Sequence, residues 1–159
     1  EYLDEVRNTV QIPILRKDFI IDPIQIEEAC AHKADAFLII AAILSVNEMK
    51  EFIKIGDSLG LDYILEIHNE EDLEKALKTD APVIGINNRD LKTFQLDLTT
   101  TLTLSKKLPQ DRKIITESGI ESLDDVRMFL NNQISTFLIG SLFMKSKNPG
   151  DALAKVKKL

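Results

Sequence analysis

The sequence predicts an α/β fold built on a parallel sheet. Short runs of β-branched and aliphatic residues alternate with longer amphipathic runs along the 159-residue chain. Each unit is a strand followed by a helix, and strand starts recur about every 20 to 30 residues, which is the length of a βα unit. Since strand-then-helix units join parallel strands by crossovers, the helices are expected outside the sheet.

Six strands and the helices between them account for most of the chain. The expected strands are Ile12–Arg16, Ala36–Ala41, Asp62–Ile67, Val83–Asn87, Lys113–Glu117 and Thr136–Gly140. The expected helices after them are Pro23–His32, Val46–Leu59, Glu70–Leu77, Leu98–Leu108, Leu123–Asn131 and Gly150–Leu159. A further helix is expected at the start, where the apolar residues of EYLDEVRNTV fall on one face.

Helix start signals support three of these helices. Asp22-Pro23 and Asn148-Pro149 each place a capping residue before a first-turn proline. Ser45-x-x-Glu48 matches a capping box.

Two architectures fit six strand-then-helix units. One is a doubly wound open sheet, and the other is a parallel (βα)₈ barrel of TIM type with the third to eighth units present and the first two absent. Polar strand ends ring one pocket in a barrel but gather at one switch point in an open sheet. Here they follow five of the six strands: Arg16-Lys17-Asp18, Glu66-Ile67-His68, Asn87-Asn88-Arg89-Asp90, Glu117-Ser118-Gly119 and Gly140-Ser141. This pattern favours a single partial barrel domain over residues 1–159.

Composition and charge exclude several classes of protein. The formal net charge is −6, whereas nucleic acid or an acidic membrane surface requires a clustered basic face. No apolar run in the sequence approaches membrane-spanning length. The single cysteine, Cys30, excludes an internal disulfide and favours a reducing, cytoplasmic location.

Two ionisable residues at strand ends are candidates for acid–base chemistry. Lys17 closes the first strand, where a lysine can act as a general acid or grip a substrate carboxylate or hydroxyl. A merely exposed lysine is the alternative. Glu66 lies in an apolar run, where a carboxylate is rarely left unpaired. It belongs either to a structural salt bridge or to a tuned acid–base pair.

The last two strands carry a candidate phosphate site. Ser118-Gly119 follows Glu117, and Gly140-Ser141 follows the final strand. Each turn lies close to a helix start, so the two together form a cradle suited to an anion. One Ser-Gly alone would be weak evidence, because glycine ends strands for many reasons.

The histidines and the cysteine are expected to be structural. No second ligand stands at metal spacing from His32 or His68, so no metal site is predicted. Cys30 has no Cys-x-x-Cys partner and lies on a helix face, where packing is the expectation. The sequence contains no Gly-x-Gly-x-x-Gly, Walker loop or nucleophile elbow.

Five segments together resemble the indole-3-glycerol-phosphate synthase family of tryptophan biosynthesis. They are PILRKDFIIDPIQIEEA, ILEIHNEEDLEKAL, IGINNRDLKTFQLDL, ITESGI and FLIGSLFMKSKNPGDAL. The similarity covers essentially the whole chain with the spacings intact, and the first and third segments are the most specific. The resemblance implies a (βα)₈ barrel that closes the indole ring of 1-(2-carboxyphenylamino)-1-deoxyribulose 5-phosphate, releasing CO₂ and water without cofactor or metal.

The resemblance also implies roles for the candidate residues. Lys17 would be the general acid at the substrate carbonyl or hydroxyl, and Glu66 the proton-transfer carboxylate. Ring closure needs acid at the carbonyl and then proton removal, so this pair suits it. The other implied roles are Phe19 packing on the aromatic ring, Glu117 holding hydroxyls, and Ser118, Gly119, Gly140 and Ser141 around the phosphate.

The stretch VIGINNRDLKTF gains a meaning from the same resemblance. Asn87 and Arg89 would orient the substrate from the end of a strand. Alternation of side chains turns Asn88 away from the pocket. Asp90 is expected to hold the loop.

The sequence departs from the family pattern at its start. The family's first strand carries Glu-x-Lys followed by Ser-Pro-Ser, and neither motif occurs here, nor do the first two strands. Such a barrel exposes two edges and an apolar interior, which predicts self-association and little or no activity of this chain alone. The chain also begins at Glu1, within a helical pattern, which predicts a fragment or a processed form.

Three other functions stay open on the sequence alone. Another phosphate-binding barrel, such as phosphoribosylanthranilate isomerase, would need a different acid–base pair, and the LRKDF and INNRDL segments argue against it. A non-catalytic phosphate-binding fragment would bind phosphate without turnover. A flavodoxin-like signalling domain would hold Lys17 and Glu117 far apart.

Overall fold

A computed structural model describes residues 2–159 of the chain. The chain divides into two compact units, residues 1–84 and 85–159. Hydrogen bonding orders the strands of the sheet as they follow one another along the chain, so consecutive strands are neighbours. A doubly wound sheet reverses its strand order at a switch point, whereas a barrel does not. The observed order therefore favours the barrel of the two architectures.

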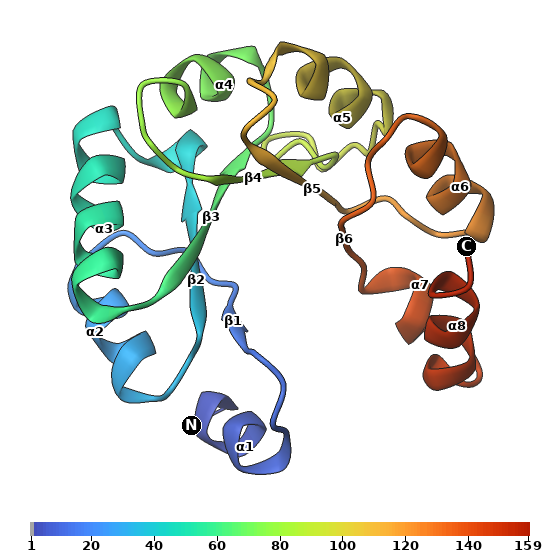
Figure 1. Cartoon of the computed structure of the whole chain (residues 1–159), viewed down its shortest axis with the longest axis horizontal. Coiled ribbons are helices and arrows are strands. Elements are labelled where there is room, and N and C mark those ends of the chain that lie inside the picture. Colours follow the sequence, from blue (N-terminus) through green and yellow to red (C-terminus); the bar gives the residue numbers. More distant parts are fainter. Residues whose placement is uncertain (1) are drawn as a thin grey trace. The chain divides into compact units, whose positions relative to one another are not determined.

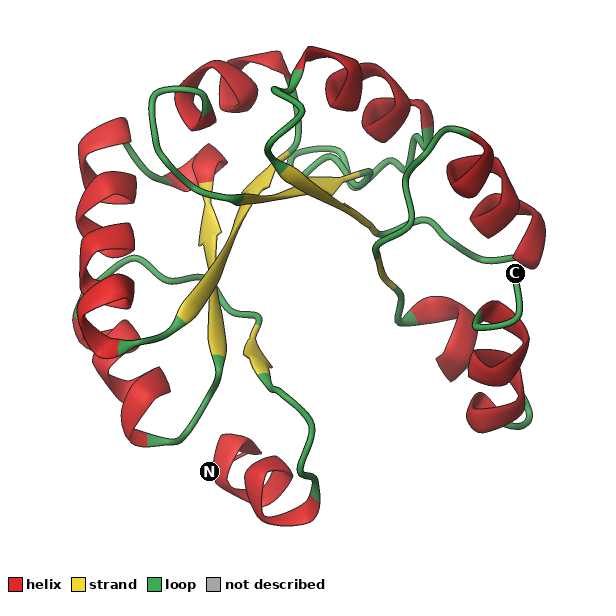
Figure 2. Cartoon of the chain, in the orientation of Figure 1, coloured by secondary structure: helices red, strands yellow, loops and turns green. Residues whose placement is uncertain are grey.

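The first unit contains three parallel strands with helices between them (Figure 1). Its elements are α1 (Tyr2–Thr9), β1 (Leu15–Arg16), α2 (Ile24–Ala31), β2 (Ala36–Ile40), the short 3-10 helix η1 (Ala41–Ile43), α3 (Val46–Leu59), β3 (Asp62–Ile67) and α4 (Glu70–Ala76). β1 pairs with β2 and β2 with β3, in a register that sets Ile40 beside Glu66. Helices α2 and α3 lie on the same side of these strands (Figure 2), as in the wall of a barrel.

Helix α3 shows how the sequence pattern builds this wall. Its buried residues are Met49, Phe52, Ile53 and Gly56, which follow helical spacing and form one face. A side chain at Gly56 would come within 2.7 Å of the Phe37 ring, so glycine lets the helix approach β2 closely.

The second unit contains the remaining strands, with β4 (Val83–Asn87) starting at the end of the first unit. Its other elements are α5 (Thr99–Leu104), η2 (Ser105–Lys107), β5 (Lys113–Glu117), α6 (Leu123–Asn131), β6 (Phe137–Leu138), α7 (Ser141–Met144) and α8 (Pro149–Val156). β5 and β6 are parallel, with Glu117 beside Leu138. A core cluster of Ile120, Val126, Phe129 and Ile134 fastens α6 to this unit.

The predicted starts of α3 and α8 are confirmed by side-chain caps, whereas α2 begins at Ile24, one residue later than predicted, with Pro23 at the cap position. Ser45 accepts a hydrogen bond from the Glu48 N–H, and the Glu48 carboxylate accepts one from the Ser45 N–H, which completes the capping box. Asn148 caps α8 ahead of Pro149. The Asp22 carboxylate accepts from the Ile24 N–H at 2.9 Å.

The first and last strands are shorter than predicted. β1 covers only Leu15–Arg16 instead of Ile12–Arg16. Pro13 has no N–H for a ladder, and the Ile14 N–H donates to the Asp35 carboxylate at 2.7 Å instead of to a neighbouring strand. β6 covers Phe137–Leu138. The helix start expected at Gly140-Ser141 is the one-turn helix α7, which was not among the predicted helix ranges.

The predicted first helix is present as α1, but it buries none of its residues among the described part of the chain. It is held by polar contacts. Asp4 lies 2.8 Å from His32 Nδ1, and Arg7 donates to Asp35 at 2.9 Å. Exposed ion pairs contribute little stability. Of the apolar face predicted for this helix, Val6 is 45% exposed, whereas Leu3 and Val10 are half-buried.

Candidate active site

The carboxyl ends of β1 and β3 bring Lys17 and Glu66 together. Lys17 Nζ lies 2.7 Å from Glu66 Oε2. The lysine side chain is 37% exposed, whereas that of the glutamate is 2% exposed. The pair is thus a salt bridge with an accessible cation and an enclosed carboxylate, a geometry in which a ligand can approach the lysine first.

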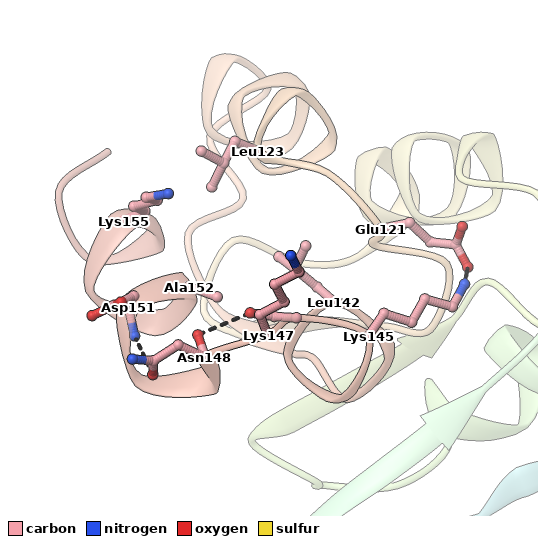
Figure 3. Close-up of a pocket in the computed structure, with 10 residues that line it drawn as sticks. Glu121, Leu123, Leu142, Lys145, Lys147, Asn148, Asp151, Ala152 and Lys155 are labelled. Carbon is pink, nitrogen blue, oxygen red and sulfur yellow. Dashed lines mark hydrogen bonds and ion pairs between the residues drawn. The ribbon is translucent and has the colours of Figure 1, made fainter.

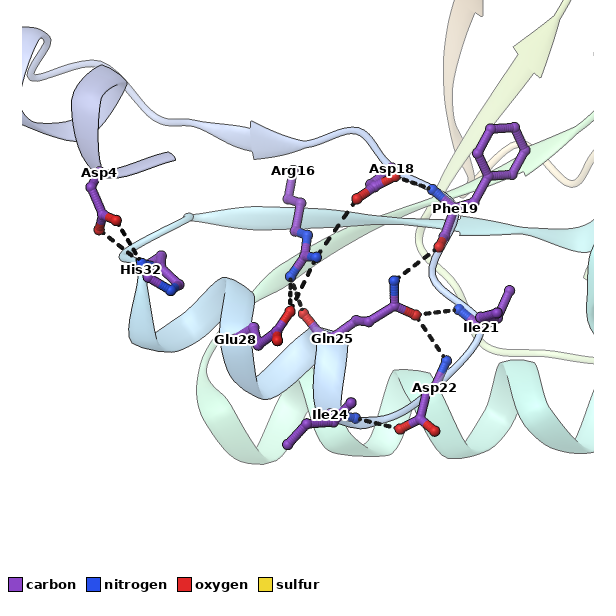
Figure 4. Close-up of polar contacts among 10 residues, drawn as sticks. All are labelled: Asp4, Arg16, Asp18, Phe19, Ile21, Asp22, Ile24, Gln25, Glu28 and His32. Atoms are coloured by element: carbon purple, nitrogen blue, oxygen red, sulfur yellow. Dashed lines mark hydrogen bonds and ion pairs between the residues drawn. The ribbon is translucent and has the colours of Figure 1, made fainter. Parts of the chain in front are cut away.

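The loop that follows β1 is held by a set of polar contacts rather than by glycine (Figure 4). The Arg16 guanidinium donates to the backbone carbonyl of Gln25 and lies 3.3 Å from the Glu28 carboxylate. The Gln25 side chain accepts from the Ile21 N–H at 2.8 Å and donates to the Phe19 carbonyl at 3.1 Å. The Phe19 ring is 57% exposed and points away from α2 (Figure 4), so it is available to an aromatic ligand.

His68 stands two residues after Glu66 and was not expected to contribute to the site. Its Nε2 lies 3.1 Å from Glu66 Oε1, and its Nδ1 lies 3.3 Å from Asp72 Oδ2. The His68 backbone N–H donates to the same Asp72 carboxylate at 3.0 Å. Burial lowers the pKa of His68, but the close contacts with Asp72 and Glu66 and the negative charges of these two carboxylates outweigh it and raise the pKa to about 9.

This shift makes the stability of the chain depend on pH. The pKa of His68 is about 9 in the folded chain and 6.5 for the unperturbed group, so protonation favours folding. The stabilisation is complete below about pH 6.5 and disappears as the pH rises through about 9, with a size on the order of 3 kcal/mol. Urea denaturation at a series of pH values should therefore show that the free energy of unfolding of the unmodified chain decreases over this pH range. His68→Gln should remove that component, whereas His32→Gln should retain it.

In the second unit, Asn87 and Arg89 lie at the end of β4, as predicted. Asn87 is buried, and its Oδ1 accepts from the Arg89 N–H at 3.0 Å. Arg89 forms an antiparallel bridge with Leu96, and its guanidinium reaches the Phe94 carbonyl at 3.5 Å. These contacts place both residues at the strand end. Their direction toward a substrate stays a prediction.

Asp90 holds the following loop, as predicted. Its Oδ1 accepts from the Lys92 N–H at 2.9 Å and from the Thr93 N–H and hydroxyl at 2.6 and 3.0 Å. Hydrogen bonds from the backbone and hydroxyl of Thr93 lower the pKa of this carboxyl. Asp90 is therefore occupied with the loop.

The candidate phosphate residues follow β5 and β6. Glu117 ends β5 fully buried, and Ser118 and Gly119 both have positive φ, at 62° and 80°. Because Glu117 pairs with Leu138, the turn after β5 and Gly140 lie at the same edge of the sheet. Gly140 precedes α7, and Ser141 is its first residue. The structure thus places both predicted turns at neighbouring strand ends.

Gly119→Ala is expected to destabilise the chain by about 1 to 2 kcal/mol. The left-handed conformation of this residue costs that much for a residue with a Cβ. The new methyl group would also lie 2.8 Å from Leu98 Cδ2, although that flexible atom can move. Urea denaturation measures the loss. Gly150→Ala is the matched control, because its φ is ordinary and its Cβ would meet Asn148 Oδ1 at 3.4 Å; an equal loss there would contradict the argument.

A cavity of about 500 Å³ lies elsewhere in the second unit, between α6, α7 and α8 (Figure 3). Its lining includes the ion pair between Lys145 and Glu121, at 2.7 Å, and the capping residue Asn148. None of the predicted site residues lines it. The predicted strand-end residues therefore lie outside this cavity.

Parallel strands that neighbour one another in chain order, with an ion pair of Lys17 and Glu66 at two strand ends, are typical of a barrel-type βα protein. Residues 1–156 match the family described as Indole-3-glycerol phosphate synthase, and the chain belongs to that family. This is a family of lyases in tryptophan biosynthesis with a TIM-barrel fold.

Individual relatives agree with this assignment. The indole-3-glycerol phosphate synthase of Polynucleobacter asymbioticus is 50% identical over 155 residues, which cover 98% of this chain and 58% of the relative. That of Polynucleobacter necessarius subsp. necessarius is 46% identical over 156 residues, with the same coverage. The chain thus spans about 58% of the length of these relatives.

Similarity to a solved structure supports the fold but not the function. 3-Hexulose-6-phosphate synthase from Salmonella typhimurium matches with a TM-score of 0.83 at 12% identity, over 98% of this chain and 77% of that one. Within residues 2–159, every helix is too short or too polar to traverse a lipid bilayer.

Proposed function

We propose that this chain carries six of the eight βα units, the third to the eighth, of an indole-3-glycerol-phosphate synthase. The enzyme would convert 1-(2-carboxyphenylamino)-1-deoxyribulose 5-phosphate into indole-glycerol phosphate, CO₂ and water. The observation that carries this proposal is the contact of Lys17 Nζ with Glu66 Oε2 at 2.7 Å, at the ends of two strands. Family membership supplies the reaction.

The pair has the two groups that the reaction needs. Closing the ring joins an aromatic carbon to the carbonyl carbon of the sugar chain, and the carbonyl oxygen must take up a proton as the bond forms. Lys17 is the accessible member of the pair and donates that proton. Because the attacked aromatic carbon carries the carboxylate, breaking its bond to CO₂ restores the benzene ring. The new hydroxyl then leaves as water, and Glu66, enclosed beside Lys17, accepts the proton lost from the neighbouring carbon as the indole forms.

The other predicted residues bind the remaining parts of the substrate, which are its aromatic ring, its hydroxyls and its phosphate. The exposed Phe19 ring packs on the anthranilate ring. Asn87 and Arg89 orient the substrate, and Glu117 holds its hydroxyls. Ser118, Gly119, Gly140 and Ser141 surround the phosphate; the register of β5 and β6, which sets their turns at one edge, supports this part of the proposal.

Further parts of the proposal concern the whole protein. A barrel with two units missing has two open edges, so copies of this chain associate through them. Light scattering after gel filtration tests this association. The reaction takes place in the cytoplasm, which agrees with a chain whose single cysteine forms no internal disulfide.

Turnover of the substrate tests the function directly. Formation of indole-glycerol phosphate is followed by fluorescence for this chain and for an extended chain. In the extended chain, the part of the Polynucleobacter asymbioticus relative that precedes the matched region is joined ahead of residue 1. We expect turnover by the extended chain and none by its Lys17→Ala variant. No turnover by a folded extended chain would remove the proposal, and phosphate binding without turnover would favour a binding fragment.

A further inference from the structure

His68 is an ionisable residue that the proposed reaction leaves without a role. Its side chain is 3% exposed, and it lies between two carboxylates that are 2% and 4% exposed, Glu66 on β3 and Asp72 in the first turn of α4. An enclosed charged group is costly unless it is paired. Three enclosed ionisable groups in contact are therefore expected to stabilise one another's charges.

The turn from β3 to α4 sets the position of the ring. Asn69 caps α4 by accepting from the Asp72 N–H at 2.9 Å. The Asp72 carboxylate then reaches back to the backbone N–H of His68 at 3.0 Å and to the ring Nδ1 at 3.3 Å. Asp72 thus holds His68 twice, and the other ring nitrogen is left to face Glu66.

The contact with Glu66 is close but incompletely formed. His68 Nε2 lies 3.1 Å from Glu66 Oε1, yet it makes no well-directed hydrogen bond among the described residues. Lys17 meets the other oxygen, Oε2, at 2.7 Å. The two carboxylate oxygens of Glu66 therefore have different cations, one accessible to a ligand and one enclosed.

Apart from Glu66 and Asp72, the charged residues of β3 and α4 are exposed, except for the half-buried Lys75, which faces elsewhere. Lys75 on α4 donates to the Ala41 carbonyl at 3.0 Å and lies 3.4 Å from the Leu44 carbonyl, on the side of η1. The charged groups that meet the His68 ring are thus Glu66 and Asp72, with Lys17 behind Glu66. This set contains two cations and two anions when the histidine is protonated.

Proton donation by Lys17 to the substrate would change the charge beside Glu66. If Lys17 gives its proton to the substrate carbonyl, the enclosed Glu66 carboxylate loses the positive charge beside Oε2. A second cation at Oε1 keeps the carboxylate charge-matched and in the same orientation during that step. His68 is the cation beside Oε1. Its Nε2 is close enough to Oε1 to form a hydrogen bond after a small movement of the ring.

We propose that His68 is a positioning residue of the active site, whose imidazolium, anchored by Asp72, holds the Glu66 carboxylate in place while Lys17 serves the substrate. This inference rests on the proposed function for its kinetic consequence, but the contact itself can be measured without turnover. His68 acts through Glu66 and does not touch the substrate.

The contact is tested by following the titration of His68 by NMR in this chain labelled with ¹⁵N-histidine. The sequence has two histidines, so the His32→Gln variant assigns the signals. We expect His68 to titrate near pH 9. Glu66→Gln and Asp72→Asn should each lower its midpoint by about one pH unit or more, since each removes a carboxylate in contact. If the midpoint of the His68 titration is the same in Glu66→Gln as in the unmodified chain, the proposal is overturned.

Kinetics of the extended chain test the consequence. His68→Gln keeps a similar size and an N–H donor but has no charge, and it should lower kcat about 10- to 100-fold while KM changes less than about twofold. Asp72→Asn should reproduce this loss in part. Glu71→Gln, at an exposed position in the same helical turn, is the matched control and should keep full activity.

The two proposals fail differently. Failure of the proposed function appears as no turnover in any form of the extended chain, while the titration of His68 still depends on Glu66. Failure of the positioning role appears as full kcat in His68→Gln, or as a loss confined to KM. A variant that has lost its structure is recognised by its urea denaturation, and in that case Asp72→Asn decides between the two results.

Discussion

Replacing Lys17 with arginine should lower indole-glycerol phosphate formation by the extended chain about 10²- to 10⁴-fold, the range that general acid catalysis contributes. Arginine keeps the positive charge, so its ion pair with Glu66 can still form and the enclosed carboxylate stays matched. A guanidinium does not release its proton in proteins, so the variant cannot serve as the acid. The initial rate at saturating substrate, followed by fluorescence, measures the effect.

A control separates this effect from a general loss of structure. Lys54 is exposed on α3 and takes part in no predicted step, so Lys54→Arg should leave the rate unchanged. The urea midpoint of Lys17→Arg should stay close to that of the parent chain. A Lys17→Arg variant that retains its rate within about tenfold would mean that Lys17 acts as a cation that grips the substrate, not as an acid.

The fold was predictable from the sequence wherever local signals agree with burial. α3 and α6 begin and end at the predicted residues, since each combines an apolar face with a side-chain cap at its start. β3, β4 and β5 also match, because each is a continuous run of residues suited to a strand. In these elements the pattern, the cap and the buried face all indicate the same structure.

The misses have local causes. The N-terminal half of the predicted first strand contains Pro13 and is tied to Asp35 by a side chain, a contact 21 positions away that no local pattern shows. α7 is a single turn, too short to produce a helical period. The predicted helix Leu98–Leu108 is divided into α5 and η2, which together still occupy most of that range.

Part of the candidate site was predictable by the same means. Lys17 and Glu66 stand at strand ends, and the parallel register brings such ends to one edge. His68 lacks a second ligand at metal spacing, so the sequence predicts a structural histidine there. The signal that could have found it is the run Glu66-x-His68-x-x-x-Asp72, in which a strand end leads into a capped helix and places the acid four residues after the histidine.

Asn88, which was predicted to point away from the pocket, is buried and hydrogen-bonded within the second unit. Its Nδ2 donates to Thr116 Oγ1 at 3.0 Å, to the Glu117 carbonyl at 3.0 Å and to the Ser118 carbonyl at 3.1 Å. Its Oδ1 accepts from the Thr101 N–H at 3.1 Å and from the Thr101 hydroxyl at 2.8 Å. The side chain is thus an internal tie between the end of β4, the end of β5 and the start of α5.

Asn88→Ala should therefore destabilise the chain by an amount on the order of 4 kcal/mol. The residue is 2% exposed, so water cannot replace the lost partners, and several donors and acceptors are left unsatisfied. With an ordinary dependence on urea, the denaturation midpoint should fall by about 2 M. Asn132→Ala is the matched control, because Asn132 is exposed and its side chain donates only to the Met128 carbonyl. A loss below about 1 kcal/mol in Asn88→Ala would contradict the tie.

The same substitution should also affect the proposed site, because Asn88 holds the carbonyls of Glu117 and Ser118. Those two residues precede Gly119, so loosening them displaces the turn proposed to hold the phosphate. In the extended chain, Asn88→Ala should raise KM more than it lowers kcat, since Lys17 and Glu66 are held by other elements. Asn88, for which no contact with the substrate is proposed, would then be a determinant of substrate binding through the backbone that it holds in place.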